Sequence, residues 1–288
     1  GFGALERGSF IHLVLERFYK RFQEEIAPKV TRETLPLAST LIETVFAELS
    51  QEQYSARAGG RYVPIDALEK AERDRILPQL QHYLEFETTL LPSFQPWQFE
   101  WSYGETEPYT YAGCAILGRI DRIDINEEGQ AVIIDYKSSL SKEYRLHSKD
   151  KKKQSSEADT GDTESFTLPS KMQALIYAKA VRAILGLNIV ASLYVNPLES
   201  EVYGAYDQRV LGLNDIPFDK DVTRTSCSIP WNNISSFDVL LDASEKLVAR
   251  RMINLATGDI APEPLDESAC QYCPVGNCPK RLAEREAN

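Results

Sequence analysis

The sequence predicts an α/β domain with a mixed central β-sheet flanked by helices, together with a mostly helical N-terminal region. Three observations support this prediction. Residues 1–95 place apolar side chains at helical spacing, residues 96–210 contain mainly strand-like segments, and residues 211–288 contain one more helix and a cysteine-containing tail. Because helical and strand-like segments follow one another along the chain, we expect the 288 residues to form a single domain around one sheet.

The helical N-terminal region is predicted from three segments. Ser9 is the expected N-terminal cap of a helix over residues 8–26, whose apolar side chains recur at helical spacing: Ile11, Leu15, Phe18 and Phe22. Two further helices are predicted over residues 35–53 and 65–90.

The strands are predicted from β-rich runs. In residues 97–103 large aromatic side chains alternate with Gln98, Glu100 and Ser102, which predicts a strand with one packed face. Residues 115–125 and 131–137 are rich in β-branched side chains and predict a hairpin joined by the turn at 126–129. The remaining predicted elements are strands over 190–196 and 201–208, a helix over 169–186 that begins at Pro169 and ends near Gly186, and a helix over 235–257.

Composition limits the classes of protein to which the chain can belong. Its net charge of -11 argues against electrostatic binding of nucleic acid, unless the acidic groups serve metals or another domain supplies a basic surface. No apolar run approaches a membrane span, and no signal-like segment is present, so we expect a soluble protein. Five cysteines do not suit a secreted disulfide framework and favour a reducing cytoplasm. Because the sequence begins with Gly1 rather than methionine, we expect a fragment of a longer protein.

The stretch most informative about chemistry is Asp135-Tyr136-Lys137, at the end of an apolar strand. Alternate side chains of a strand point the same way, so Asp135 and Lys137 are expected on one face. Burying either charge without a partner is costly. A salt bridge at a strand end explains this pair without any catalytic role, and the three residues alone favour that interpretation.

Asp121 adds a second carboxylate. It lies on the neighbouring strand of the predicted hairpin, where pairing across the turn can bring it alongside Asp135. Two adjacent carboxylates repel each other unless a divalent cation lies between them, and Mg²⁺ prefers a few carboxylates together with water and phosphate oxygens. With Lys137 nearby, this set suits hydrolysis of a phosphodiester. Asp124 falls on the opposite face from Asp121 and is interpreted as structural.

The motifs around these residues resemble a known family. Gly118-Arg-Ile-Asp-Arg-Ile-Asp124 followed by Ile133-Ile-Asp-Tyr-Lys-Ser138 resembles the PD-(D/E)xK nuclease superfamily, and more narrowly the RecB-like and AddB-like nuclease domains of bacterial DNA-repair helicase–nucleases. Gly8-x-x-x-His12 resembles the family's N-terminal histidine motif, and Gln173-x-x-x-Tyr177 resembles its Q-x-x-x-Y motif. The motifs occur in the family's order, and the resemblance implies a restriction-endonuclease-like core.

The resemblance implies roles for individual residues. The metal, Mg²⁺ or Mn²⁺, would be held by His12, Asp121, Asp135 and the backbone carbonyl of Tyr136, and Lys137 would be the catalytic lysine. Gln173 and Tyr177 would order the site and the DNA. Glu100 is a further candidate on the preceding strand, although an exposed strand glutamate explains it equally well. Taken singly, His12 is also explained as a partly buried helix histidine, and Gln173 and Tyr177 as ordinary residues at the edge of the core.

The cysteine tail suggests a second metal site. Cys270, Cys273 and Cys278 have a spacing with which thiolates can wrap one metal centre. The resemblance implies a [4Fe–4S] cluster in the full-length protein, with a fourth cysteine upstream of the histidine motif. No cysteine precedes His12 here, and neither Cys114 nor Cys227 matches that position. A three-cysteine zinc site and three unoccupied thiols are the competing interpretations.

A positive stretch follows the predicted active-site strand, within a polar segment over residues 138–165 that we expect to be a mobile loop. It contains Lys142, Arg145, His147, Lys149 and Lys151–Lys153. This segment can steer a phosphate backbone toward the site. A solvated loop is the favoured interpretation, because Glu157, Asp159, Asp162 and Glu164 follow closely.

The function predicted from these features is that of a metal-dependent DNA nuclease in recombination and repair. The resemblance implies an exonuclease on single-stranded or unwound ends, within a larger AddB-like protein of the bacterial cytoplasm, with a helicase or helicase-like partner or attached domain. The alternative is a nuclease-fold domain without activity that serves as a DNA-binding or assembly module. A stand-alone nuclease of the CRISPR-associated type is a third hypothesis, against which the long helical N-terminal region argues.

Overall fold

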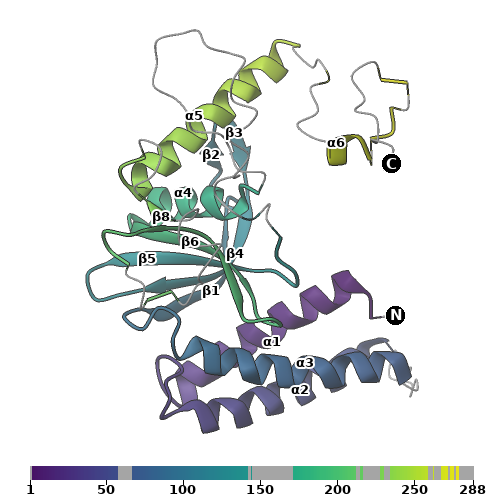
Figure 1. Ribbon diagram of the computed structural model, residues 1–288. Coiled ribbons are helices and arrows are strands. Elements are labelled where there is room, and N and C mark those ends of the chain that lie inside the picture. The colour runs from purple at the N-terminus through teal and green to yellow at the C-terminus, as the bar shows by residue number, and fades with distance from the viewer. Residues whose placement is uncertain are drawn as a thin grey trace, which may run out of the picture.

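The computed structural model arranges the chain in three layers (Figure 1). A layer of α1 (Ala4–Glu25), α2 (Leu35–Arg57) and α3 (Ala67–Glu87) lies on one side of a central sheet, and α4 (Gln173–Leu185) and α5 (Phe237–Ala256) lie on the other. A short helix, α6 (Glu267–Gln271), follows α5. The structure describes residues 2–57, 67–141, 144, 171–211, 215–216, 228–229, 234–258, 262, 267–271, 273–275 and 277–278. None of the helices in these ranges combines the length and the apolar character needed to cross a membrane.

The central sheet is mixed, as the sequence predicts. Its strand order is β1-β4-β5-β6-β7-β8, and the strands are β1 (Gln95–Tyr103), β4 (Gly118–Ile125), β5 (Gln130–Tyr136), β6 (Asn188–Asn196), β7 (Glu201–Asp207) and β8 (Ser228–Ile229). The β1–β4, β4–β5 and β6–β7 pairs are antiparallel, whereas β5 pairs with β6 in parallel. A parallel pair needs a crossover, and α4 lies within the connection from β5 to β6.

The side chains of strand β5 are buried on both faces of the sheet. Val132 and Ile134 pack against the layer of α1, α2 and α3, whereas Ala131 and Ile133 pack against α4 and α5. All four side chains are fully buried. A strand covered on both sides reads as a continuous apolar run, which is the pattern of residues 131–134.

Two predicted element boundaries are wrong. Helix α1 begins at Ala4, its N-terminal cap is Gly3, and no side chain caps it, so Ser9 lies inside the helix. Ala4, Leu5 and Glu6 are strong helix formers and extend the helix toward the N-terminus. The single strand predicted over 115–125 is divided into β3 (Cys114–Ile116) and β4, because β3 pairs with β2 (Tyr109–Tyr111) in a separate two-stranded sheet.

The helix predicted to begin at Pro169 is described from Gln173, and Pro169 itself lies outside the described residues. Its predicted end is confirmed, since Gly186 is its C-terminal cap in the left-handed conformation with φ 68°. Most of the polar segment 138–165, including Lys142, Arg145, His147, Lys149 and Lys151–Lys153, also lies outside the described residues.

The prediction of one packed face for β1 is wrong as well. Phe99 stacks on Tyr19 of α1, with ring centroids 5.5 Å apart and planes 5° apart. Trp101 and Tyr103 lie on the other face, in a group of apolar side chains that we call the α4–α5 cluster and that includes Leu175, Val181, Phe237 and Leu240. Glu100, between Phe99 and Trp101, has φ 49°. A left-handed residue interrupts the alternation of a strand, so the aromatic side chains of β1 are divided between both faces.

Candidate active site

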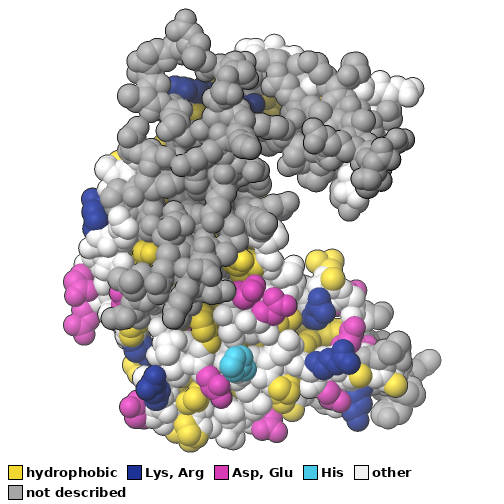
Figure 2. Space-filling model, viewed as in Figure 1, with side chains coloured by type: hydrophobic (Ala, Val, Ile, Leu, Met, Phe, Trp, Pro, Cys, Tyr) yellow, Lys and Arg dark blue, Asp and Glu magenta, His cyan; other side chains and the backbone are white. Residues whose placement is uncertain are grey.

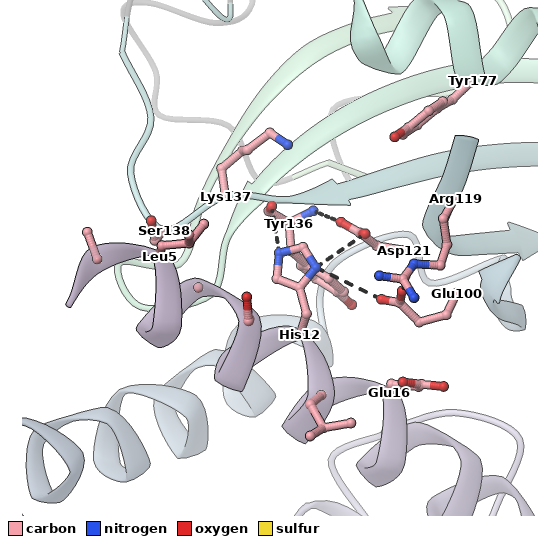
Figure 3. Close-up of a pocket in the computed structure, with 14 residues that line it drawn as sticks. Leu5, His12, Glu16, Glu100, Arg119, Asp121, Tyr136, Lys137, Ser138 and Tyr177 are labelled. Atoms are coloured by element: carbon pink, nitrogen blue, oxygen red, sulfur yellow. Dashed lines mark hydrogen bonds and ion pairs between the residues drawn. The ribbon is translucent and has the colours of Figure 1, made fainter. Parts of the chain in front are cut away.

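The residues singled out in the sequence meet in a cavity of about 650 Å³ where α1 approaches the ends of β1, β4 and β5 (Figure 3). His12, Glu100, Asp121, Tyr136 and Lys137 line it. Three of the elements, β1, β4 and β5, lie within residues 95–136, whereas α1 is distant in the sequence, and the fold brings it to them.

The β4–β5 hairpin places the two predicted aspartates opposite each other. Arg122 pairs with Ile134, so the next residues along the two strands are Asp121 and Asp135. The side chain of Asp135 is 2% exposed. Burial and then the charge of Asp121 raise the pKa of Asp135 to about 6, and Lys137 only partly offsets this. A nearby positive charge therefore stabilises the ionised form of Asp135.

His12 joins α1 to the sheet through both ring nitrogens. Its Nδ1 lies 3.2 Å from Oδ1 of Asp121, and its Nε2 lies 3.1 Å from the backbone carbonyl oxygen of Tyr136. Burial lowers the pKa of His12, but the hydrogen bond and charge of Asp121, with Glu100 and Asp135 adding to them, outweigh burial and raise it. Both neighbours are acceptors, so they favour the protonated ring over the neutral one.

Glu100 faces the same cavity, and the exposed strand glutamate of the sequence analysis is not what the structure contains. Its side chain is 13% exposed and lies 3.9 Å from Nδ1 of His12 and 2.8 Å from Nε of Arg119. Burial and the charge of Asp121 raise its pKa. The facing strand is irregular at the same level, since Ile120 packs with the α4–α5 cluster and Arg122 lies over Tyr19 on the other face. Glu100 and Asp121 therefore lie side by side where both strands lose their alternation.

The donor atoms of His12, Glu100 and Asp121 all lie within 4.8 Å of one another. Among the described residues, no other group of His, Cys, Asp and Glu side chains meets this criterion. Two carboxylates, an imidazole and the nearby Tyr136 carbonyl form a donor set that fits Mg²⁺ or Mn²⁺. Asp135 is not in this group, but burial and then the charge of Asp121 raise its pKa.

Lys137 is held from two sides. It forms an ion pair with Asp135, and its Nζ donates a hydrogen bond of 3.0 Å to Oε1 of Gln173. Gln173 in turn donates from Nε2 to the hydroxyl of Tyr177 at 2.7 Å. The first turns of α4 are thereby joined to the end of β5.

Behind the site lies a buried charged network that contacts Tyr136. Arg122 contacts both carboxylate oxygens of Asp124 at 2.5 and 2.6 Å, Glu87 of α3 at 2.6 Å, and the hydroxyl of Tyr136 at 3.3 Å. Asp124 is 1% exposed and lies away from the cavity. The interpretation of Asp124 as structural therefore agrees with its position.

Arg119 is a cavity residue that the sequence analysis missed. Its side chain is 68% exposed and pairs with Glu100, and it lines the cavity near Asp121. The only signal in the sequence is its place between Gly118 and the Asp121 motif. Among the described residues that line the cavity, Arg119 and Lys137 are the only arginine and lysine.

The cysteines are not gathered into a site in the described part of the chain. Cys270 is buried in α6, Cys273 and Cys278 are half-buried, and the backbone N–H of Cys273 donates to the carbonyl of Cys270 at 3.3 Å. No three thiols of the described residues lie within 4.8 Å of one another. Cys114 is in β3, and Cys227 lies outside the described residues.

On the molecular face drawn in Figure 2, the described lysines and arginines are scattered among acidic side chains rather than gathered in one patch. This agrees with the net charge of -11. The described residues on this face offer no broad basic surface for a duplex.

The fold and site define a member of a nuclease superfamily. The family model for the PD-(D/E)XK nuclease superfamily matches residues 2–278, so the chain belongs to this superfamily. No curated protein matches the chain.

Proposed function

We propose that the chain is a Mg²⁺- or Mn²⁺-dependent deoxyribonuclease that hydrolyses phosphodiester bonds. The observation that supports this most is the convergence of His12, Glu100 and Asp121 in one cavity with Lys137 beside them. Membership of the PD-(D/E)XK nuclease superfamily supports the same activity.

The chain's own residues suggest how the work is divided. His12, Asp121, Asp135 and the carbonyl of Tyr136 would hold the metal, and Glu100 would add a carboxylate on the side of β1. A bound divalent cation polarises the phosphate and lowers the pKa of an attacking water. Lys137 presents an ammonium group, fixed by Asp135 and Gln173, that offsets the charge developing on the phosphate oxygens. Arg119 is the exposed cation at the cavity mouth and binds a neighbouring phosphate.

The RecB-like and AddB-like motifs support a narrower proposal. We infer an exonuclease that acts on single-stranded or unwound DNA ends in recombination and repair. It forms the C-terminal part of a longer protein in the bacterial cytoplasm, with a helicase or helicase-like domain. Such a partner supplies the basic surface that the described face in Figure 2 lacks.

The cysteine tail belongs to this narrower proposal. Cys270, Cys273 and Cys278 hold a [4Fe–4S] cluster in the longer protein, with zinc as the competing occupant. Iron, sulfide and zinc analysis of the longer protein purified without oxygen distinguishes the two, and the absence of all three removes this part of the proposal.

The test is digestion of end-labelled single- and double-stranded DNA in Mg²⁺, Mn²⁺ or EDTA, with the wild type, Asp135→Ala and Lys137→Ala. Cleavage that needs metal and is lost in both variants supports the nuclease, and the label gives its polarity. Binding of DNA without cleavage under any condition favours instead the inactive binding module.

A further inference from the structure

A second, smaller cavity lies beside the candidate active site, between the end of β1, the β1–β2 connection and α4. Its volume is about 230 Å³. We call it the aromatic groove, and its main lining residues are Trp101, Ser102, Tyr103, Glu107, Tyr109 and Ile184. Neither the motifs nor the proposed reaction uses these side chains.

Aromatic rings connect the groove to the active-site cavity. Trp101 stacks against Tyr103 with centroids 5.9 Å apart and planes 27° apart, and Tyr103 meets Tyr109 edge-on at 5.7 Å. Tyr103 also meets Tyr177 edge-on at 6.2 Å, and Tyr177 lines the active-site cavity. The two cavities therefore share one aromatic wall.

Strand β1 also links the two cavities. Glu100 is directed toward His12 and Asp121, whereas the next residue, Trp101, lies against the α4–α5 cluster and lines the groove. Consecutive residues of β1 thus serve the two cavities. Neighbouring residues of a strand point to opposite faces, and Glu100 and Trp101 follow this rule.

Charge and size restrict what the groove can bind. Its lining contains no lysine or arginine and one carboxylate, that of Glu107, so a phosphate is disfavoured there. Its volume is below the range of about 300 to 1,000 Å³ that is typical of sites for drug-sized ligands. A small, planar and uncharged ring suits aromatic walls, since stacking on Trp and Tyr is favourable for every nucleobase.

Arg119 lies between the two cavities. It pairs across the strands with Ser102 of the groove. Its side chain is 68% exposed and also lines the active-site cavity. A phosphate bound by Arg119 would therefore place its nucleoside on the side of Ser102 and the groove.

We propose that the aromatic groove binds an unstacked nucleobase of single-stranded DNA next to the phosphate that is cleaved. This inference rests on the proposed nuclease function and adds a base-binding site to it. In a duplex the base is already stacked and paired, and taking it out costs free energy. The groove therefore favours single strands and unpaired ends.

The test is a scan of short single-stranded oligothymidylates in which one nucleotide at a time is abasic. Binding is measured by fluorescence anisotropy with Ca²⁺ and no Mg²⁺ or Mn²⁺, and the strands are checked for integrity. For the wild type, removal of the base at one position weakens binding roughly 5- to 30-fold, and removal elsewhere has a smaller effect. Trp101→Leu binds the intact strand less tightly by a similar factor and loses the dependence on that position.

Trp97→Leu is the matched control, because Trp97 is on the same strand, is 40% exposed and does not line the groove. It keeps the positional dependence of the wild type. A flat abasic profile in a wild type that binds DNA overturns this inference and leaves the nuclease proposal intact. The same holds if folded Trp101→Leu keeps the positional dependence. A wild type that neither binds nor cleaves DNA overturns the proposed function and this inference together.

Discussion

Oδ2 of Asp121 accepts a hydrogen bond from the backbone N–H of Tyr136 at 2.6 Å. Oδ1 of the same carboxylate lies 3.2 Å from His12, which also contacts the carbonyl of Tyr136. A side chain proposed to bind metal thus also continues the pairing between β4 and β5. Its charge and its hydrogen bond are separate contributions, and substitutions can distinguish them.

Asp121→Asn keeps an oxygen that can accept the Tyr136 N–H but removes the charge. We expect metal-dependent cleavage to fall roughly 10²- to 10³-fold, with an unfolding temperature in EDTA that is retained or raised. Asp121→Ala also removes the acceptor, and should lose about 1 kcal/mol of stability relative to Asn. Single-turnover cleavage and thermal unfolding measure the two effects, and an Asn variant as active as the wild type would show that the charge is not needed.

The contact from Lys137 to Gln173 leads to a second prediction. Gln173→Leu keeps the size of the side chain but removes both of its hydrogen bonds, to Lys137 and to Tyr177. Because Lys137 then loses one of its two supports, we expect the cleavage rate to fall roughly 10- to 100-fold with little change in stability.

The control for Gln173→Leu lies on the same helix. Lys179 pairs with Asp242 and Glu245 of α5, away from the cavity. Lys179→Met should cleave DNA at nearly the wild-type rate. Equal losses in the two variants would mean that the effect comes from the docking of α4 rather than from Lys137.

The placement of Asp135, Lys137 and Asp121 could be predicted from the sequence, because it depends on local geometry. Strand alternation places Asp135 and Lys137 on one face, and a short hairpin places Asp121 opposite Asp135. The contact of His12 with Tyr136 joins residues 124 positions apart. No periodicity reports such a contact, so only the resemblance to the nuclease family predicted it.

Glu100 illustrates what the sequence does not reveal. A left-handed residue in a strand is usually marked by Gly or Asn, but here a glutamate adopts φ 49°. The surrounding pattern of alternating aromatics predicts a regular strand, and the tertiary packing of Phe99 on Tyr19 and of Trp101 against the α4–α5 cluster overrides it. The division of the β1 aromatic side chains between both faces depends on these tertiary contacts, so the local pattern could not predict it.

The buried Asp135 leads to a prediction on pH. Its pKa is raised to about 6 in the folded protein, against about 3.8 for the ordinary group. The folded state therefore holds this proton more tightly than the unfolded state does. The stabilisation is fully present below pH about 4 and is lost as the pH rises through 6.

Asp135→Asn has no such ionisation. In EDTA at pH 7.5 we expect it to be more stable than the wild type by roughly 2–3 kcal/mol, and the difference should shrink toward zero near pH 4. Denaturant unfolding of both proteins across this range measures it. A difference that is constant with pH would contradict the raised pKa, and a saturating divalent cation should reduce the difference at pH 7.5, because binding stabilises only the wild-type site.

The buried network behind Tyr136 leads to the last prediction. Arg122 is 2% exposed and is the cationic partner of both Asp124 and Glu87. Arg122→Met fills much of the same space but leaves two buried carboxylates without that partner, so we expect a loss of about 3–5 kcal/mol in the free energy of unfolding. Arg17→Met, which breaks the exposed contact with Glu52, should change stability little.

Because Tyr136 also loses the Arg122 contact to its hydroxyl, Arg122→Met that remains folded at low temperature should bind Mn²⁺ more weakly than the wild type. Unchanged Mn²⁺ affinity, measured by calorimetry on the folded variant, would mean that the network supports the fold and not the position of the Tyr136 carbonyl.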